Sequence, residues 1–252
     1  MESDQRSWAV VAGATGTLGG AIARKLATKG LKILAVARRK DELEALAADV
    51  PAITPCVADL SDNTSVEEIG RHINGPVKIV VQAIGLPIWP KDEPFDPAAM
   101  GIAVNTKVGG LLRLTNALNE HLTAGSRIVA LGGYHGFEPD PTATTPGVTN
   151  AAIANLVRQL SVRYGQKGVS VHLISPGPVD SLRIRKLAQD SALITGDDAE
   201  SILDGWRRES SFNRLITVDQ VAWFVALLLD SEADALHGSV IHMDGGRRKG
   251  II

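Results

Sequence analysis

Seven short runs of β-branched and other apolar residues alternate along this chain with longer segments of helical period. The runs are 8–12, 33–37, 53–57, 79–82, 127–131, 169–174 and 240–242. Between them, apolar residues recur every three or four positions, as at Leu18, Ile22 and Leu26, which predicts amphipathic helices. Parallel strands joined by crossover helices produce this alternation. The sequence therefore predicts an α/β fold: a doubly wound, mostly parallel seven-stranded sheet with helices on both faces.

No linker rich in Pro, Ser or Gly divides the 252 residues, so residues 1–252 are predicted to form a single domain. The 26 Lys and Arg residues against 28 Asp and Glu residues give a net charge of −2. This leaves no broad basic surface for nucleic acid or an acidic membrane. The single cysteine, Cys56, excludes an internal disulfide framework and a Cys-rich metal site. No run reaches membrane-spanning length and the charged N-terminus lacks a signal-peptide core, which favours a cytoplasmic location.

A glycine-rich turn, GATGTLGG, follows the first apolar run and precedes a helical segment. Such a turn lets the backbone approach a pyrophosphate, and the helix N-terminus adds unpaired N–H groups and the positive end of the helix dipole. The same glycines would also suit a purely structural strand-to-helix turn. On the first interpretation, a Rossmann-type dinucleotide site is formed by Gly13, Thr15, Gly16, Thr17, Leu18 and Gly19.

Two arginines, Arg38 and Arg39, follow the second apolar run. A protein selective for NAD(H) usually carries an acidic residue there, on the ribose hydroxyl groups, whereas arginine suits a 2′-phosphate. The alternative is that both side chains, with Lys40, simply solvate a loop. We predict NADP(H) as the cofactor in preference to NAD(H).

Several motifs, in the same order, resemble those of the short-chain dehydrogenase/reductase family over nearly the whole chain. The glycine turn matches in place, but its spacing is G-x-x-G-x-x-G, with Thr17 where most single-domain members have glycine. The chain is therefore identified as a divergent member of this family. The other motifs are Asp59-Leu60, Gln82-Ala83-Ile84-Gly85 in place of an Asn-Asn-Ala-Gly turn, Asn105 in a helix, the Pro-Gly segment at 175–181 and the Asp-Gly-Gly turn at 243–246.

The resemblance implies a role for each of these motifs. Asp59 would meet the adenine amino group, and Ser181 would bind the nicotinamide carboxamide. Asn105 would belong to the family's proton relay. The further cofactor-binding positions that the resemblance implies are Leu60, Ala83, Ile84, Gly85, Asn150, Pro176, Gly177 and Val179.

Active members of the family use a Ser, a Tyr and a Lys, the last two as Tyr-x-x-x-Lys. The residues four positions after the two tyrosines, Tyr134 and Tyr164, are Glu138 and Gly168, so the chain has no such motif. A positioned general acid contributes roughly 10²–10⁴-fold to a reaction of this kind. The family's ordinary hydride transfer is therefore not expected here. At the three catalytic positions, the alignment places Gly133 for Ser, Pro146 for Tyr and Asn150 for Lys.

Tyr134 and His135 follow the fifth run directly and could supply the acid-base group instead, because an imidazole titrates in the range that this chemistry needs. The alternative is that Tyr134 is a packing aromatic residue and His135 lies on a loop surface. Thr144 and Thr145 are predicted to cap the following helix. No histidine pairs with Cys or a carboxylate at metal-ligand spacing, so no metal site is predicted.

Two functions fit these observations. The first is an NADP(H)-binding family member that has lost the usual hydride-transfer centre and acts as a structural or regulatory subunit. The second is an NADP(H)-dependent oxidoreductase, or a non-redox enzyme, whose acid-base chemistry has moved to Tyr134 or His135. Apolar positions in the helices near 100–121 and 150–164 exceed what one face against the sheet requires, which predicts a homo-oligomer or a hetero-oligomer with an active paralogue.

Residues 181–213 are polar and weakly periodic, and we expect them to form a partly helical flap over the site. Apolar side chains in this segment and after the fourth run would suit a small apolar ligand or an interface, and would suit a cap on the core equally well. These residues are Leu182, Ile184, Leu187, Leu203 and Trp206 in the segment, with Ile88 and Trp89 after the fourth run.

Overall fold

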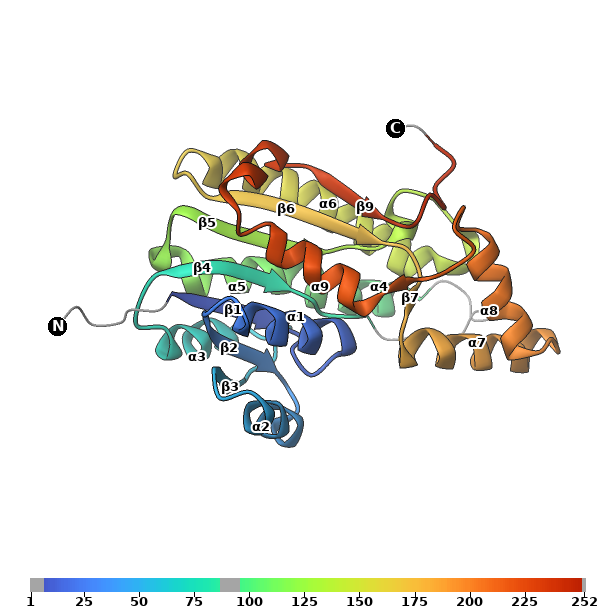
Figure 1. Ribbon diagram of the computed structural model, residues 1–252, viewed down its shortest axis with the longest axis horizontal. Coiled ribbons are helices and arrows are strands. Elements are labelled where there is room, and N and C mark those ends of the chain that lie inside the picture. The colour runs from blue at the N-terminus through green and yellow to red at the C-terminus, as the bar shows by residue number, and fades with distance from the viewer. Residues whose placement is uncertain (1–6, 87–95, 251–252) are drawn as a thin grey trace.

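A computed structural model describes residues 7–86 and 96–250. Its centre is a seven-stranded sheet in the order β3-β2-β1-β4-β5-β6-β9, with every neighbouring pair parallel (Figure 1). This confirms the predicted fold class. Ile88 and Trp89 lie outside the described residues. The strands are β1 (Trp8–Ala12), β2 (Lys32–Ala37), β3 (Ile53–Val57), β4 (Val77–Gln82), β5 (Leu122–Leu131), β6 (Ser170–Pro176) and β9 (Val240–Met243).

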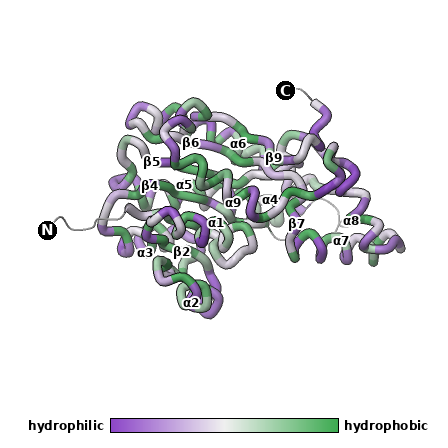
Figure 2. The backbone as a smooth tube through the Cα atoms, viewed as in Figure 1, coloured by the Kyte–Doolittle hydropathy of each residue, from purple (hydrophilic) through white to green (hydrophobic). Residues whose placement is uncertain are grey.

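Helices cover both faces of the sheet (Figure 1). Consecutive residues of β1 belong to opposite cores, Val10 to one and Val11 to the other, so the central strands are buried on both sides. Figure 2 accordingly shows much of the central strands in green, the colour of hydrophobic residues. One face packs against α1 (Thr17–Ala27), α2 (Lys40–Asp49) and α9 (Val218–Leu227), the other against α3 (Thr64–His72), α5 (Gly110–Leu118) and α6 (Thr144–Gly165).

The strand order reverses between β1 and β4. From β1 the chain builds β2 and β3 toward one edge, and from β4 it builds toward the other edge. In doubly wound sheets, ligands bind in the crevice that this reversal opens at the carboxyl ends of the strands. Two helices from the predicted flap, α7 (Leu182–Thr195) and α8 (Ala199–Arg208), lie beyond that end of the sheet (Figure 1). A two-strand pairing of β7 (Val179–Asp180) with β8 (Ile216–Thr217) brings the two ends of the segment 181–213 together.

The helix expected near 100–121 is interrupted. Asp96 caps its start by accepting a hydrogen bond from the Ala98 N–H at 2.8 Å, and α4 (Pro97–Val104) is followed by a π-helical turn, η1 (Asn105–Gly109), before α5 begins. A π-helical turn inserts an extra residue and changes which side chains face inward, and such turns often occur at functional sites. A 3₁₀ turn, η2 (Asn119–His121), ends the segment.

The helix expected to begin near Asn150 begins earlier, at Thr144. The prediction that Thr144 and Thr145 cap it is wrong: both are helical residues, and the residue before them, Ala143, offers no side-chain acceptor. Proline lacks an N–H, and first-turn N–H groups have no partner inside the helix, so Pro146 fits there at no cost. Two 3₁₀ turns precede the helix, η3 (Tyr134–Gly136) and η4 (Pro141–Ala143), and another, η5 (Ser231–Leu236), precedes β9. None of the helices in the described ranges is long and apolar enough to cross a membrane.

Candidate cofactor and active site

The glycine turn is too tightly packed for side chains at two positions. Gly13 has a φ of +79°, and a Cβ atom there would lie 2.8 Å from the carbonyl oxygen of Ala83 at the end of β4. A Cβ atom on Gly19 would lie 2.1 Å from the carbonyl oxygen of Gly13. Both distances are shorter than any van der Waals contact, so these positions require glycine. The turn therefore presents bare backbone at the carboxyl edge of the sheet.

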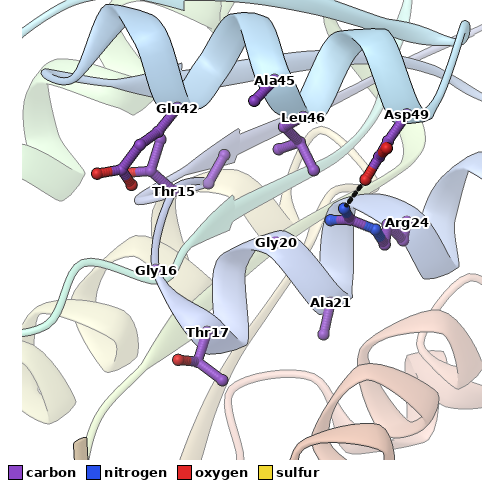
Figure 3. Close-up of a pocket in the computed structure, with 11 residues that line it drawn as sticks. Thr15, Gly16, Thr17, Gly20, Ala21, Arg24, Glu42, Ala45, Leu46 and Asp49 are labelled. Atoms are coloured by element: carbon purple, nitrogen blue, oxygen red, sulfur yellow. Dashed lines mark hydrogen bonds and ion pairs between the residues drawn. The ribbon is translucent and has the colours of Figure 1, made fainter. Parts of the chain in front are cut away.

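The first turn of α1 presents free N–H groups. Its N-cap residue, Gly16, has no side chain that could accept a hydrogen bond from them. Beside it lies a hollow of about 570 Å³, bounded by residues 15–17 on one side and by Glu42 and Leu46 of α2 on the other (Figure 3). The Arg24–Asp49 ion pair, at 2.7 Å, closes one end of the hollow. Uncapped N–H groups at a helix N-terminus form a ready anion site.

The two arginines after β2 have different surroundings. Arg39 donates to the carbonyl and hydroxyl oxygens of Thr15, both at 3.3 Å, and forms an ion pair with Glu42, so it ties α2 to the glycine turn. Arg38 is exposed and forms no hydrogen bond or ion pair with any residue of the described ranges. Arg38 is therefore the side chain available to an external anion.

The remaining predicted cofactor positions meet at the same edge. Ala12 is in register with Gln82, so the glycine turn and residues 83–85 leave the sheet side by side. The Gly177 N–H donates to the carbonyl oxygen of Met243 at 2.9 Å, which joins the Pro-Gly segment to the end of β9. Individual positions in this edge are Asp59 (exposed, accepting from Ser61), Leu60 (buried), Ala83, Ile84, Gly85, Pro176, Val179 and Ser181, the N-cap of α7.

Lys107 lies at the centre of this edge with its amine inside the protein. The residue is 4% exposed. Its Nζ donates to the carbonyl oxygen of Gly132 at 3.2 Å and to Oδ1 of Asn150 at 2.6 Å. Its own carbonyl oxygen accepts a hydrogen bond from Nε2 of Gln82 at 3.0 Å. Burial, with a smaller contribution from the positive charge of Arg183, lowers the pKa of Lys107 to about 7.

Lys107 is absent from the site predicted from sequence, although the sequence contains a signal for it. It follows Ala103 by four residues and precedes Leu111 by four, and both of these residues are fully buried. Lys107 therefore lies on the apolar stripe of its helix. A lysine on such a stripe needs partners inside the protein, because lysine is almost never fully buried alone.

Two glycines make room for Asn150. A Cβ atom on Gly133 would lie 2.6 Å from Nδ2 of Asn150, and one on Gly136 would lie 2.8 Å from its Cβ. Gly133 precedes the turn η3 and Gly136 is its last residue, so the turn packs directly on α6 at Asn150. The positions that the family alignment pairs with Ser and Lys, Gly133 and Asn150, are thus in contact, whereas Pro146 lies one turn earlier in α6.

Tyr134 and His135 lie in η3, the turn that packs on α6 at Asn150. Their rings meet edge-on with centroids 5.5 Å apart, and the guanidinium of Arg247 lies 4.8 Å from the Tyr134 ring centroid. Arg247 also forms an ion pair with Glu209. Burial lowers the pKa of His135, so its neutral form prevails at pH 7. Tyr134 and His135 thus lie together in the turn that packs on α6 at Asn150.

Asn105 faces another direction. Its Nδ2 donates to the carbonyl oxygen of Ser61 at 2.8 Å, and its Oδ1 accepts from Nη2 of Arg113 at 2.9 Å. The Asn105 side chain at the start of the π-helical turn η1 thus points toward the connection after β3. The Lys107 side chain, two residues later in the same turn, points into the interior.

Several polar atoms at this edge are buried without a hydrogen-bond partner among the described residues. They come from four different elements, β4, η3, α6 and β6, and the sheet register brings the ends of the strands together. Buried polar atoms in native proteins nearly always have a partner, so these atoms mark places for water or a ligand. They are Oε1 of Gln82, Nδ1 of His135, Oγ1 of Thr149 and Oγ of Ser175.

One group of possible metal ligands lies away from this edge. Ligand atoms of Cys56, Glu68 and His72 come within 4.8 Å of one another between β3 and α3. The sequence predicts no metal site, because these residues are not at metal-ligand spacing along the chain and come together only through the contact between strand and helix. Burial, and then the charge of Glu68, raises the pKa of Cys56 to about 12. The thiol is therefore protonated and a poor metal ligand.

The sequence match decides the family. A family model described as enoyl-(acyl carrier protein) reductase matches residues 13–248, which begin at the glycine turn and include all but the last two described residues at the C-terminal end. The chain belongs to the short-chain dehydrogenase/reductase family. Among its relatives, the short-chain reductase protein NovJ of Streptomyces niveus is 27% identical over 270 residues, covering 96% of this chain and 94% of NovJ. The oxidoreductase UcpA of Escherichia coli (strain K12) is 29% identical over 250 residues, covering 94% of this chain and 93% of UcpA.

Solved structures show the same fold for this short-chain dehydrogenase/reductase. An actinorhodin polyketide ketoreductase variant with NADPH superposes with a TM-score of 0.90, at 20% identity, over 99% of this chain and 100% of that one. The L-sorbose reductase of Gluconobacter frateurii, complexed with NADPH and L-sorbose, has a TM-score of 0.87 at 21% identity, covering 98% of each chain. Identities this low establish the fold alone.

Proposed function

We propose that this protein is an NADP(H)-dependent oxidoreductase that interconverts a carbonyl compound and an alcohol at a rebuilt active centre. The observation that carries the proposal is the buried amine of Lys107, which donates a hydrogen bond to Asn150. Asn150 is at the position where the family has its catalytic lysine. Burying an amine without a carboxylate partner is costly, and such groups concentrate at functional sites. The family's relatives named above are a reductase and an oxidoreductase, and the two similar structures contain NADPH, which supports this reaction class.

The residues present fit an NADP(H) molecule. Gly13 and Gly19 let the backbone approach a pyrophosphate, and the uncapped N-terminus of α1 offers N–H groups to it. We assign the 2′-phosphate to Arg38, the adenine to Asp59 and Leu60, and the nicotinamide half to the strand ends. The residues that we assign to the nicotinamide half are Ala83, Ile84, Gly85, Asn150, Pro176, Gly177, Val179 and Ser181.

When bound, NADPH would supply a hydride for the carbonyl carbon, which would leave the C=O electron pair on the oxygen and require one proton to complete the alcohol. The protein must therefore hold that oxygen and deliver the proton. We assign proton delivery to His135, recharged by water, because its ring is half-buried in η3, the turn that packs on α6 at Asn150. Residues 181–213 act as a flap over the substrate in this proposal, and residues 1–252 as one domain. The cytoplasmic location stays a prediction.

Calorimetric titration should show that the protein binds NADPH more tightly than NADH. Replacing Arg38 with alanine should weaken NADPH binding by roughly 10–100-fold, the value of a hydrogen bond to a charged group, and leave NADH binding unchanged. Lys40→Ala is the matched control, because Lys40 already pairs with Glu44 at 3.6 Å and should affect neither cofactor. Equal affinity of the wild type for both cofactors would contradict the assignment.

Purified protein should oxidise NADPH in the presence of a ketone such as acetophenone or ethyl acetoacetate, and His135→Ala should lower kcat by about 10²-fold. The rate of ketone reduction should fall as the pH rises through the lowered pKa of His135, because only the imidazolium has a proton to give. Tyr134→Phe removes a hydroxyl group from the same turn and shows whether that oxygen takes part. If turnover survives both substitutions unchanged, the proton source has been misplaced.

A second function is favoured by one observation, the apolar surface of the helices behind the sheet. Of the predicted excess, Leu111, Leu118, Ile153, Val157 and Leu160 are buried, while other apolar side chains on these helices face solvent. Such a surface suits an NADP(H)-binding subunit, without turnover of its own, in a homo-oligomer or beside an active paralogue. NADPH binding without turnover, together with a dimeric mass in light scattering, would favour it. The exposed side chains are Ile102 (59%), Leu112 (40%), Val148 (49%) and Val162 (61%).

A further inference from the structure

The amide of Asn150 has a defined orientation. A lysine amine that donates hydrogen bonds needs an acceptor, so the Asn150 atom 2.6 Å from Nζ of Lys107 is its carbonyl oxygen, Oδ1. The amide nitrogen, Nδ2, is then the atom on the other side. It donates no hydrogen bond to any residue in the described ranges. Asn150 therefore presents two N–H groups that are free to bind something else.

The free Nδ2 occupies the space of the missing serine side chain. A Cβ atom on Gly133 would lie 2.6 Å from Nδ2, 3.4 Å from the amide carbon and 3.7 Å from Oδ1, so the nitrogen is the part of the amide nearest to that space. The family's serine hydroxyl would project from the same Cβ atom. An N–H donor thus stands where the family has an O–H donor, and both can bind a carbonyl oxygen.

The surroundings of this amide favour negative charge. Lys107 is buried, and it forms no ion pair within the described part of the chain. Arg183, on the flap helix α7, adds a second positive charge near Lys107, whose pKa it helps to lower. Its Nη1 lies 3.9 Å from the Cβ position of Gly85, three residues after the end of β4. An electric field acts more strongly in a dry interior than in water. A developing oxyanion next to Asn150 would therefore be stabilised.

We propose that Asn150 and Lys107 form the oxyanion-binding pair of this site. The Asn150 N–H donates to the substrate oxygen as hydride transfer makes it negative, and Lys107 is the positioning residue that fixes the amide and places positive charge behind it. Gly133 is part of the same arrangement, since any side chain there would displace the amide. This inference rests on the proposed oxidoreductase function and concerns the oxygen of the same carbonyl substrate.

Kinetics with NADPH and a ketone tests the role of Asn150. Asn150→Asp keeps the shape and the contact with Lys107 but replaces the N–H donor with an oxygen, so kcat measured at saturating NADPH should fall by roughly 10²–10³-fold. Asn155→Asp, at an exposed position on the same helix α6, is the matched control and should keep wild-type kcat. Full activity of Asn150→Asp in an active wild type would overturn the inference and leave the oxidoreductase function standing.

A rescue variant separates a lost donor from a damaged fold. Gly133→Ser alone should lower activity, because its side chain would meet Nδ2 of Asn150. Combined with Asn150→Ala, the serine has room and restores a hydroxyl donor, so the double variant should recover roughly tenfold of the activity that Asn150→Ala loses. A double variant no better than Asn150→Ala would count against a donor at this place.

An NMR titration tests the role of Lys107 without any substrate. In protein labelled with ¹⁵N-asparagine, the Asn150 amide signal, identified by its loss in Asn150→Asp, should shift with a midpoint near pH 7 as Lys107 titrates. The shift should vanish in Lys107→Met. If the pH-dependent shift of the Asn150 amide signal is the same in Lys107→Met as in the wild type, the inference is overturned. If the signal responds as expected but wild-type protein oxidises no NADPH with any ketone tested, the proposed function itself fails, and the oxyanion role fails with it.

Discussion

Replacing Gly19 with alanine should abolish NADPH binding and destabilise the fold. The added Cβ atom would lie 2.1 Å from the carbonyl oxygen of Gly13 and 3.0 Å from Cα of Ala14, so the backbone of the turn must move. Backbone cannot rotate aside as a flexible side chain can. We expect the free energy of unfolding to fall by about 1–3 kcal/mol, as in other overpacked sites, and the pyrophosphate-binding N–H groups to lose their alignment.

Urea unfolding and calorimetry with NADPH measure the two effects separately. Gly101→Ala is the control, because Gly101 is an exposed residue of α4 with open space around its Cβ position. That substitution should keep NADPH affinity and stabilise the helix by up to about 1 kcal/mol. If Gly19→Ala binds NADPH like the wild type, the turn is a purely structural element and the cofactor site lies elsewhere.

The strands and the glycine turn could be predicted because their signals are local. A strand covered by helices on both faces must be apolar along its whole length, which isolates runs such as 8–12 and 33–37 from their surroundings. The turn at Gly13 needs a positive φ and a close backbone approach, and both demand glycine. The order of motifs then indicated the family, and the family indicated the fold.

The start of the helix α6 could not be read from its sequence. A proline is compatible with any position of the first helical turn, because the N–H groups there lack partners in the helix. The threonines before Pro146 therefore fit either as caps or as helical residues, and packing of η3 against the helix decides between these. This packing depends on the contact between Gly136 and Asn150. The two residues belong to different elements, so the apolar pattern of the helix does not reveal the contact.

The contact between Lys107 and Asn150 was beyond prediction for a different reason. The two residues are 43 positions apart and lie on different helices. Their meeting depends on the π-helical turn η1, whose extra residue changes the direction of side chains at the junction of α4 and α5. Polar residues on helices normally face solvent, so a lysine in a helix is ordinarily read as exposed. Its place on the apolar stripe was the one local sign of burial.

Raising the pH should stabilise the wild type relative to a Lys107→Met variant. In the folded protein the pKa of Lys107 is about 7, and in the unfolded chain it returns to its ordinary value of 10.5. Between these pH values the unfolded chain binds more protons than the folded protein, so the free energy of unfolding rises with pH. The rise is at most roughly 1.4 kcal/mol per pH unit, and it is absent below the folded pKa. Methionine has no proton to bind and lacks this contribution at every pH.

Urea unfolding of both proteins at about pH 7, 8 and 9 gives the difference between their free energies of unfolding, in which all shared titrating groups cancel. Lys167→Met, at an exposed lysine, is the control and should show no such slope.

The charges around Lys107 fix the sign of its pKa shift: Arg183 acts in the same direction as burial, while the acceptors of Gly132 and Asn150 are uncharged. A neutral amine uses its two N–H groups on those two acceptors, whereas the ammonium has a third N–H group with no partner among the residues that the structure describes. If the difference between the two free energies of unfolding does not change with pH, water reaches the amine of Lys107. Water would then screen the electric field that the oxyanion-binding pair needs.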